Sequence, residues 1–328
     1  MTDQPSTTPT AKPPRARPKP QRASAELASL FENQRGPERI AKRLARAGLC
    51  SRRDAERWIA DGRVAVDGAV LDSPAMTVDQ SSRILVDEQP IPTIEPPRLW
   101  RFHKPRGTVT TTRDPEGRPT VFDRLPADLP RVMTVGRLDF DSEGLLLLTN
   151  DGALARHLEL PSTGWLRRYR VRVYGTLNDR ALANLKRGVT VDGIDYGSIE
   201  VTIDRPGKNS WLTVGLREGK NREIRRVMEH LGLTVSRLIR ISYGPFQLGD
   251  VADGGVEEIK TRVLKDQLGI TSPDDSGHAK AKARPSRPPP PGGRNKDGKD
   301  KPAKRATLSL KPSPGGPRAD RRRKTPGR

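Results

Sequence analysis

The chain has 328 residues, and its 61 Lys and Arg against 40 Asp and Glu give a formal net charge of +21. So large an excess is typical of proteins that bind a polyanion, either nucleic acid or an anionic membrane surface. A membrane-spanning protein is excluded, because no apolar run approaches the roughly 18 residues that cross a bilayer. The N-terminus also lacks the apolar core of a secretion signal. We therefore expect a cytoplasmic protein that binds nucleic acid.

Cysteine and histidine usage limits the chemistry. The single cysteine, Cys50, has no partner for an internal disulfide, and no Cys and His cluster has zinc spacing. We expect no metal site and no cofactor.

The two ends of the chain differ in composition from its middle. Residues 1–36 are rich in Pro, Thr, Ser and Arg, and from residue 271 onward Pro, Gly, Lys and Arg dominate. Such segments bury too little apolar surface to offset the entropy cost of ordering, so both tails are predicted to be disordered. Residues 271–328 hold 17 Lys and Arg against 5 Asp and Glu, so the middle of the chain is only moderately basic. The tails are solvated linkers or nonspecific RNA-binding arms, and the two are compatible.

Residues 37–95 are predicted to form a small domain. Ile40, Leu44 and Ala47 recur at helical spacing, and Ser51 is a residue type that favours the N-cap of a second helix. The other elements expected here are strands at 64–66 and 84–86, a hairpin turn at Asp67-Gly68 and a proline-rich linker at 90–97.

Residues 96–270 are predicted to form a second, larger α+β domain. Few of its strands are separated by a helix, which favours a mainly antiparallel sheet. Alternation is clearest in 168–174, where Tyr169, Val171 and Val173 share one face. Strands are expected at 99–103, 132–135, 145–149, 168–174, 211–216 and 238–242, and helices at 151–159, 178–187, 220–231 and 256–268.

The segment from Arg39 to Gly68 resembles the alpha-L RNA-binding domain over its helix–helix–strand core. Its Ser-Arg-Arg step places Arg52 and Arg53 in the first turn of a helix, where cations oppose the helix dipole unless phosphates dock there. The resemblance implies binding of structured RNA by shape and phosphate contacts, and the alternative is an ordinary solvated basic face. The residues expected to bind RNA in this domain are Arg39, Lys42, Arg43, Arg46, Ser51, Arg52, Arg53 and Arg63.

The segment 136–152 places a carboxylate, Asp139, just before a strongly apolar strand. From residue types alone Asp139 is either a structural cap or a catalytic group. Asp141 and Glu143 are competing acids that most simply face solvent. Asp151 is most simply the N-cap of the following helix.

The same segment, Gly-Arg-Leu-Asp-x-x-Ser-x-Gly-Leu-Leu-Leu-Leu-Thr-Asn-Asp-Gly, resembles the signature of the RsuA/RluB family of bacterial ribosomal RNA pseudouridine synthases. The resemblance implies a pseudouridine synthase domain whose nucleophile is Asp139. It also implies that Arg225 pairs with this carboxylate and that Tyr169 stacks on the detached uracil and moves a proton. Three further stretches agree with the family in its order: 102–107, 167–171 and 218–226.

The implied reaction is an isomerisation, so it needs no metal, redox partner or ATP. A facing Arg225 would hold Asp139 ionised against the effect of burial. The target uridine must leave its stack to reach the site. The alternatives are a core aromatic for Tyr169 and one more helix cation for Arg225. Phosphate contacts around the pocket are expected from Lys104, Arg106, Arg137, Lys220 and Arg222.

The segment 114–126 closely resembles the RluB branch of the family, which modifies 23S rRNA in the peptidyl-transferase region. The expected partner is therefore 23S rRNA or a large-subunit assembly intermediate, bound by a monomer. A rival hypothesis is a ribosome assembly factor without catalysis, which the presence of Asp139, Tyr169 and Arg225 disfavours. A second rival, a glycosidase-like hydrolase, would need a second positioned acid.

Overall fold

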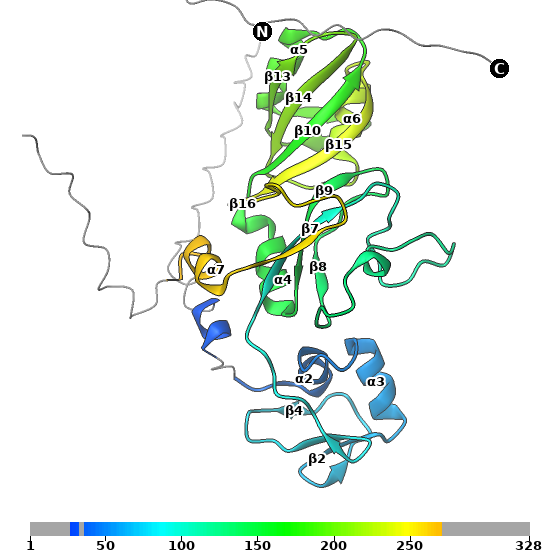
Figure 1. The fold of residues 1–328 in the computed structure, drawn as a ribbon, viewed down its shortest axis with the longest axis vertical. Helices are drawn as coiled ribbons and strands as arrows, with labels where there is room; N and C mark the ends of the chain where they lie inside the picture. Colours follow the sequence, from blue (N-terminus) through cyan, green and yellow to red (C-terminus); the bar gives the residue numbers. More distant parts are fainter. Residues whose placement is uncertain (1–26, 33–35, 271–328) are drawn as a thin grey trace, which may run out of the picture. The chain divides into compact units, whose positions relative to one another are not determined.

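A computed structural model describes residues 27–32 and 36–270 of the chain (Figure 1). The disorder expected for 271–328 and for most of 1–36 lies outside the described residues. Residues 27–31 are helical, which departs from that expectation, because Leu27, Leu30 and Phe31 recur at helical spacing and Leu27 is buried. Within the described ranges, no helix has the length and apolarity needed to cross a bilayer.

The small domain is built on two helices and a four-stranded sheet. Both predicted helices are confirmed, as α2 (Ile40–Arg46) and α3 (Arg52–Ala60). Ile40, Leu44 and Ile59 are fully buried in the core beneath them. The sheet order is β3-β2-β5-β6, formed by β2 (Val64–Val66), β3 (Ala69–Val70), β5 (Ile84–Val86) and β6 (Gln89–Pro90), and a separate pair joins β1 (Glu38–Arg39) to β4 (Thr77–Val78).

The larger domain contains one extended sheet with the order β13-β14-β10-β15-β9-β7-β17. Its pairings are antiparallel except for a short parallel contact between β15 and β9, so the expected mainly antiparallel α+β fold is confirmed. The strands on this path are β7 (Leu99–Lys104), β9 (Glu143–Thr149), β10 (Arg167–Tyr174), β13 (Ile199–Arg205), β14 (Asn209–Leu216), β15 (Thr234–Tyr243) and β17 (Val256–Ile259). Off the path, β8 (Met133–Val135) pairs with β9 and β16 (Phe246–Gln247) with β15, while β11 (Val189–Val191) and β12 (Ile194–Tyr196) form their own hairpin.

Two hydrophobic cores lie against this sheet. One contains Tyr169, Val171 and Val173 of β10, as the alternation in the sequence predicts. The other contains Leu145 and Leu147 of β9. The helices of this domain are α4 (Gly152–Glu159), α5 (Asp179–Asn184) with the 3-10 turn Leu185–Arg187, α6 (Glu223–His230) and α7 (Thr261–Gln267), and a further 3-10 turn lies at Phe122–Arg124 and another at Pro161–Thr163.

The sequence-based assignment of the larger domain fails in several places, of which three concern its long strands and helices. The helix expected over 256–268 is wrong in its first part, because Val256–Ile259 pairs with β7 as an edge strand. The helix expected from residue 220 begins at Glu223, because Arg222 adopts a left-handed conformation with φ 51°. Strand β13 was not predicted, because its residues are largely exposed at the sheet edge.

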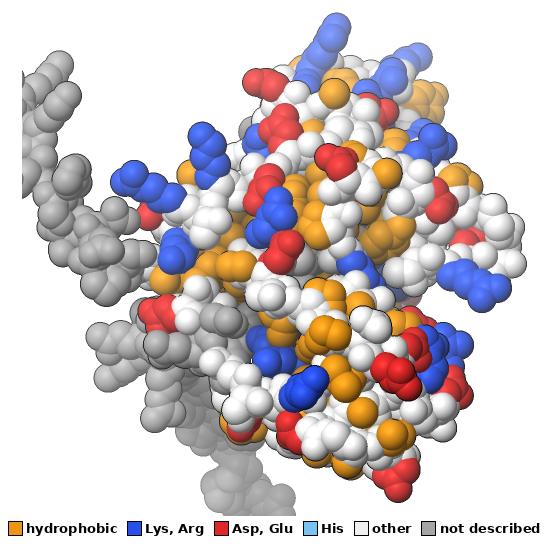
Figure 2. Space-filling model, turned by 60° about the horizontal axis from the view of Figure 1, so that its bottom comes forward, with side chains coloured by type: hydrophobic (Ala, Val, Ile, Leu, Met, Phe, Trp, Pro, Cys, Tyr) orange, Lys and Arg blue, Asp and Glu red, His pale blue; other side chains and the backbone are white. Residues whose placement is uncertain are grey.

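The surface of the described part mixes charges of both signs. Figure 2 shows Lys and Arg side chains interspersed with Asp and Glu over the face in view. This agrees with the modest net charge that the sequence gives for the middle of the chain.

Candidate active site

Asp139 lies in the loop that joins β8 to the buried strand β9 and is partly exposed. Its carbonyl oxygen accepts a hydrogen bond from the amide of Ser142 at 3.0 Å, which closes a tight turn. The hydroxyl of Thr110 donates to the carbonyl oxygen of Leu138 at 2.7 Å and so fixes the residue before Asp139. The carboxylate is therefore carried by a backbone held at both ends.

Lys104 stabilises the same turn through hydrogen bonds to backbone carbonyl groups. Its ammonium group donates to the carbonyl oxygens of Ser142, at 2.8 Å, and Pro105, at 3.1 Å. The side chain is fully buried, so the expectation that Lys104 contacts RNA phosphates is wrong. Burial lowers the pKa of Lys104 to about 8, although the negative charge of nearby Asp139 opposes the shift.

Gly144, in the segment after Asp139, occupies a position that only glycine can adopt. It faces Arg240 where β9 and β15 run parallel, and its φ is +99°. A Cβ at this position would lie 2.4 Å from the carbonyl oxygen of Arg240. Only glycine permits so close an approach of the two strands.

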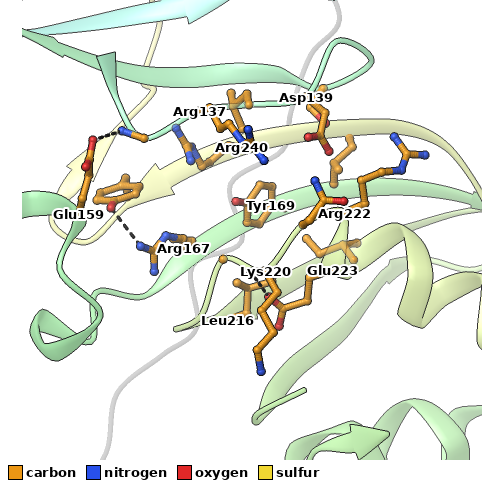
Figure 3. Close-up of a pocket in the computed structure, with 18 residues that line it drawn as sticks. Arg137, Asp139, Glu159, Arg167, Tyr169, Leu216, Lys220, Arg222, Glu223 and Arg240 are labelled. Carbon is orange, nitrogen blue, oxygen red and sulfur yellow. Dashed lines mark hydrogen bonds between the residues drawn. The ribbon is translucent and has the colours of Figure 1, made fainter. Parts of the chain in front are cut away.

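A cavity of about 310 Å³ opens beside Asp139, within the range of small-molecule sites. Tyr169 of β10 lines it and is 8% exposed. In Figure 3 the Tyr169 ring lies between Asp139 and Arg240 on one side and Lys220 and Glu223 on the other. The structure thus brings two of the three predicted catalytic residues, Asp139 and Tyr169, to one pocket.

Arg225, the third, contacts the backbone of the Asp139 loop. Its guanidinium donates to the carbonyl oxygens of Asp141 and Val235, each at 3.1 Å. Among the described residues no ion pair joins Arg225 to the carboxylate of Asp139, so the expected direct pairing is not present. Burial lowers the pKa of Arg225, and the negative charges of Asp141 and Asp139 oppose that shift. The charge of Arg225 therefore acts on Asp139 at longer range.

Arg240 is a pocket residue that sequence reasoning missed. It is 3% exposed, lies opposite Tyr169 in the β10–β15 register, and donates through Nε to the carbonyl oxygen of Leu145 at 2.7 Å. Its Nη2 is buried without a hydrogen-bond partner in the described part of the chain. The available signal was a charged residue on the inward face of an alternating strand, between Leu238 and Ser242.

The cations that were expected to contact phosphates around the cavity differ in their exposure and in their ion pairs. Arg137 and Arg222 are exposed and line the cavity, as expected of phosphate contacts. Arg106 is exposed and lies 3.6 Å from the carboxylate of Asp141. Lys220 also lines the cavity, but its ammonium group is 2.6 Å from Glu218.

Glu223 adds a buried acid to the pocket wall. One of its oxygens accepts from the amide of Lys220 at 3.0 Å, while Oε1 is buried without a partner in the described part. Burial raises the pKa of this carboxyl group.

In the small domain, Arg46 is not the exposed cation that the helix pattern predicts. Its side chain is 6% exposed and lies 2.6 Å from the buried Glu38, and Arg43 lies 3.5 Å from the same carboxylate. Lys42 is 3.4 Å from Glu38 but is 39% exposed. Because a buried acid needs paired cations, Arg46 serves the core of the domain rather than an RNA-facing surface.

The other predicted residues of that domain divide by exposure. Arg39, Arg52 and Arg53 are exposed, and no salt bridge of the described residues involves them. Ser51 is confirmed as an N-cap and forms a capping box with Asp54. Arg63 is paired with Asp87 and stacks on Trp58, with its guanidinium carbon 4.8 Å from the ring centre.

No cluster of three or more His, Cys, Asp or Glu side chains among the described residues has the arrangement of a metal site.

Comparison with known proteins gives the family. A model described as RNA pseudouridylate synthase matches residues 98–230, and an S4 domain model matches residues 38–84. An uncharacterized RNA pseudouridine synthase of Rickettsia prowazekii is 47% identical over 231 residues, which cover 70% of this chain and 97% of the relative. The chain belongs to the RNA pseudouridine synthases.

Other relatives of this pseudouridine synthase agree. The ribosomal large subunit pseudouridine synthase B of Haemophilus influenzae is 42% identical over 245 residues, covering 71% of this chain and 68% of the relative. A crystal structure of a pseudouridylate synthase, 22% identical, covers 70% of this chain and 99% of its own with a TM-score of 0.50, and so shares the fold. The enzyme is an RNA isomerase with an S4 domain, as the sequence motifs predict.

Proposed function

We propose that this pseudouridine synthase acts in the cytoplasm on a uridine of 23S rRNA in the peptidyl-transferase region, with Asp139 as its nucleophile. The choice of rRNA is supported by the similarity to large-subunit enzymes such as that of Haemophilus influenzae. The sequence of 114–126, which resembles the same branch, agrees with this choice.

The observation that carries the role of Asp139 is its place at the rim of the Tyr169 cavity, on a turn held from both ends. A carboxylate so fixed is presented to the sugar of a uridine that enters the cavity. Of the described residues, Asp139 is the single aspartate that lines it, and the other acids there are Glu159 and Glu223. Glu159 accepts a hydrogen bond from the amide of Gly136, and Glu223 is bound to the amide of Lys220.

The proposed reaction breaks the bond between N1 of uracil and C1′ of ribose and joins C5 to C1′ instead. Asp139 acts at the sugar, either covalently or as a base, while the detached uracil stacks on the ring of Tyr169 and turns. C5 then loses its proton and N1 regains one, so no atom is gained or lost. Tyr169 is the group placed to move a proton.

The positive charge around Asp139 fits this role. Lys104 and Arg225 both interact electrostatically with Asp139. Both cations are held in place by hydrogen bonds to carbonyl oxygens of the turn that carries Asp139. Arg240, buried at the cavity wall, adds a third fixed charge.

The test is Asp139→Asn, assayed by release of tritium from RNA labelled at C5 of uridine. We expect turnover to fall at least about 1,000-fold while RNA affinity stays within about threefold, because the substitution removes the nucleophile and keeps the shape. Asp141→Asn, a carboxylate of the same turn that does not line the cavity, is the matched control and should retain most of the activity. Undiminished turnover in Asp139→Asn would remove Asp139 as the nucleophile.

A further inference from the structure

Strand β10 carries three arginines on the face opposite the active site. Arg168, Arg170 and Arg172 are exposed, and they alternate with the buried residues of the same strand. Alternate residues on one face of a strand have Cα atoms about 6.7 Å apart, so the three arginines follow one another in a line, here called the arginine row. Tyr169 lines the cavity from the other face of the strand.

The arginine row is unpaired, in contrast to other cations of the same sheet. No salt bridge among the described residues involves any of its three members. Arg237 on the neighbouring strand is bound to Glu143 at 2.6 Å, and Arg101 of β7 is 2.5 Å from Glu257 of the edge strand β17. Three like charges in a line repel one another, and the acids on this face, Glu200 opposite Gly215 and Asp204 bound to Thr213, belong to β13, one strand beyond β14.

The face that carries the arginine row is open. Its neighbours across the β10–β14 register are Gly215, Thr213 and Trp211, of which only the last is large. The guanidinium carbon of Arg170 lies 4.7 Å from the centre of the partly exposed Trp211 ring. Figure 1 shows β10, β13 and β14 with no helix in front of them.

We propose that the arginine row binds the phosphodiester backbone of the RNA substrate, at a segment separate from the one that enters the active site. The row lies on the opposite face from Tyr169, so the nucleotide that reaches Asp139 does not contact it. Guanidinium groups bind phosphate oxygens in a bidentate manner, and their regular spacing suits successive phosphates of one strand. An indole beside them offers a flat surface for a base.

An acidic protein surface is the competing partner, and the described geometry disfavours it. A row of cations with a single aromatic residue beside it lacks the apolar centre of a protein–protein interface. The substrate of the enzyme, in contrast, is a polyanion with more charge than the active site can contact.

The experiment compares two triple variants of the full chain that remove the same charge. The test variant is Arg168→Gln, Arg170→Gln and Arg172→Gln. The matched control is Arg180→Gln, Lys186→Gln and Arg187→Gln, which changes exposed cations on α5 and the 3-10 turn after it. Binding to a 23S rRNA transcript is measured across salt concentrations, and tritium release is measured separately.

If the arginine row binds phosphates, the slope of log K against log salt becomes less negative by about 2 to 3 in the test variant, since each phosphate contact contributes about 0.7–0.9 to its magnitude. The control changes it by less than half as much. A third variant with lysine at the three row positions keeps most of the slope and so excludes a merely structural effect of the substitutions.

Equal slopes for the test and control variants would overturn the proposal. Equal slopes combined with lost binding to an acidic ribosomal protein would assign the row to a protein partner instead. Failure of the wild-type enzyme to release tritium from 23S rRNA would contradict the proposed substrate and leave the slope comparison intact.

Discussion

At the scale of single residues, the site depends on groups that touch backbone rather than substrate. Lys104 and Arg225 both donate to carbonyl oxygens of the turn that carries Asp139. Each brings a positive charge near the carboxylate while fixing its position. The sequence motifs identify Lys104 and Arg225 as charged residues near the site, but they do not show that Lys104 is fully buried.

The burial of Lys104 predicts a pH effect on stability. Its pKa is about 8 in the folded protein against 10.5 for a lysine in the unfolded chain, so between these values only the unfolded chain holds the proton. The free energy of unfolding therefore gains a contribution that rises with pH across this window, by about 3 kcal/mol in all. The difference in unfolding free energy between wild type and Lys104→Met should rise from pH 8 to pH 10.5 in chemical denaturation. A constant difference would show that the pKa of Lys104 is not lowered.

At the scale of elements, the contact between β9 and β15 positions the pocket. It places Gly144 against the backbone of Arg240, and Arg240 stands beside Tyr169 on the next strand. A change at this crossing would move both walls of the cavity.

Gly144→Ala should therefore destabilise the protein by about 3 to 5 kcal/mol, because its Cβ would meet backbone at 2.4 Å. Gly193→Ala is the matched control: its φ is +74°, but nothing lies within 4 Å of the added carbon. The control should lose only about 1 kcal/mol, from backbone strain alone. Thermal denaturation of the two variants provides the comparison, and similar losses would contradict the importance of the strand crossing.

Much of the fold could be predicted from the sequence where periodicity is strong. The helices after Ser51 and Asp151 have side-chain caps at their N-termini, and β10 alternates cleanly. The strand at Val256–Ile259 could not be predicted, because an edge strand is decided by its partner β7 rather than by its own pattern.

The candidate site was predictable only in part. Asp139 and Tyr169 follow from local motifs, and both line the cavity. The position of Arg240 depends on the pairing of β15 with β10, which are far apart in the sequence. The burial of Arg46 depends on its ion pair with the buried Glu38. Helical or strand spacing alone assigns such cations to the surface, because it carries no information on their partners.

At the scale of the whole molecule, the enzyme joins an S4 domain to a catalytic domain. The exposed cations Arg52 and Arg53 at the start of α3 remain the strongest candidates for phosphate contacts in the S4 domain. If Arg52 and Arg53 contribute to the affinity for RNA while the cavity of the catalytic domain carries out the chemistry, the two functions should separate on mutation.

The double variant Arg52→Gln and Arg53→Gln should thus raise KM for rRNA while leaving kcat within about twofold. The slope of log K against log salt should become less negative by about 1.5 to 2 if both residues contact phosphates. Arg57→Gln, on the same helix but paired with Asp54, is the control and should change the slope little. A fall in kcat without a change in KM would place these residues in the catalytic step instead.

The central claim is that Asp139 forms pseudouridine in large-subunit rRNA. Its most direct test is carbodiimide-based mapping of pseudouridine across total rRNA from cells that lack this gene, complemented with wild type or with Asp139→Asn. We expect that a single site in the peptidyl-transferase region of 23S rRNA is lost without the gene, returns with wild type and stays absent with Asp139→Asn. An unchanged map in cells without the gene would contradict it and favour a ribosome assembly role or a substrate outside rRNA.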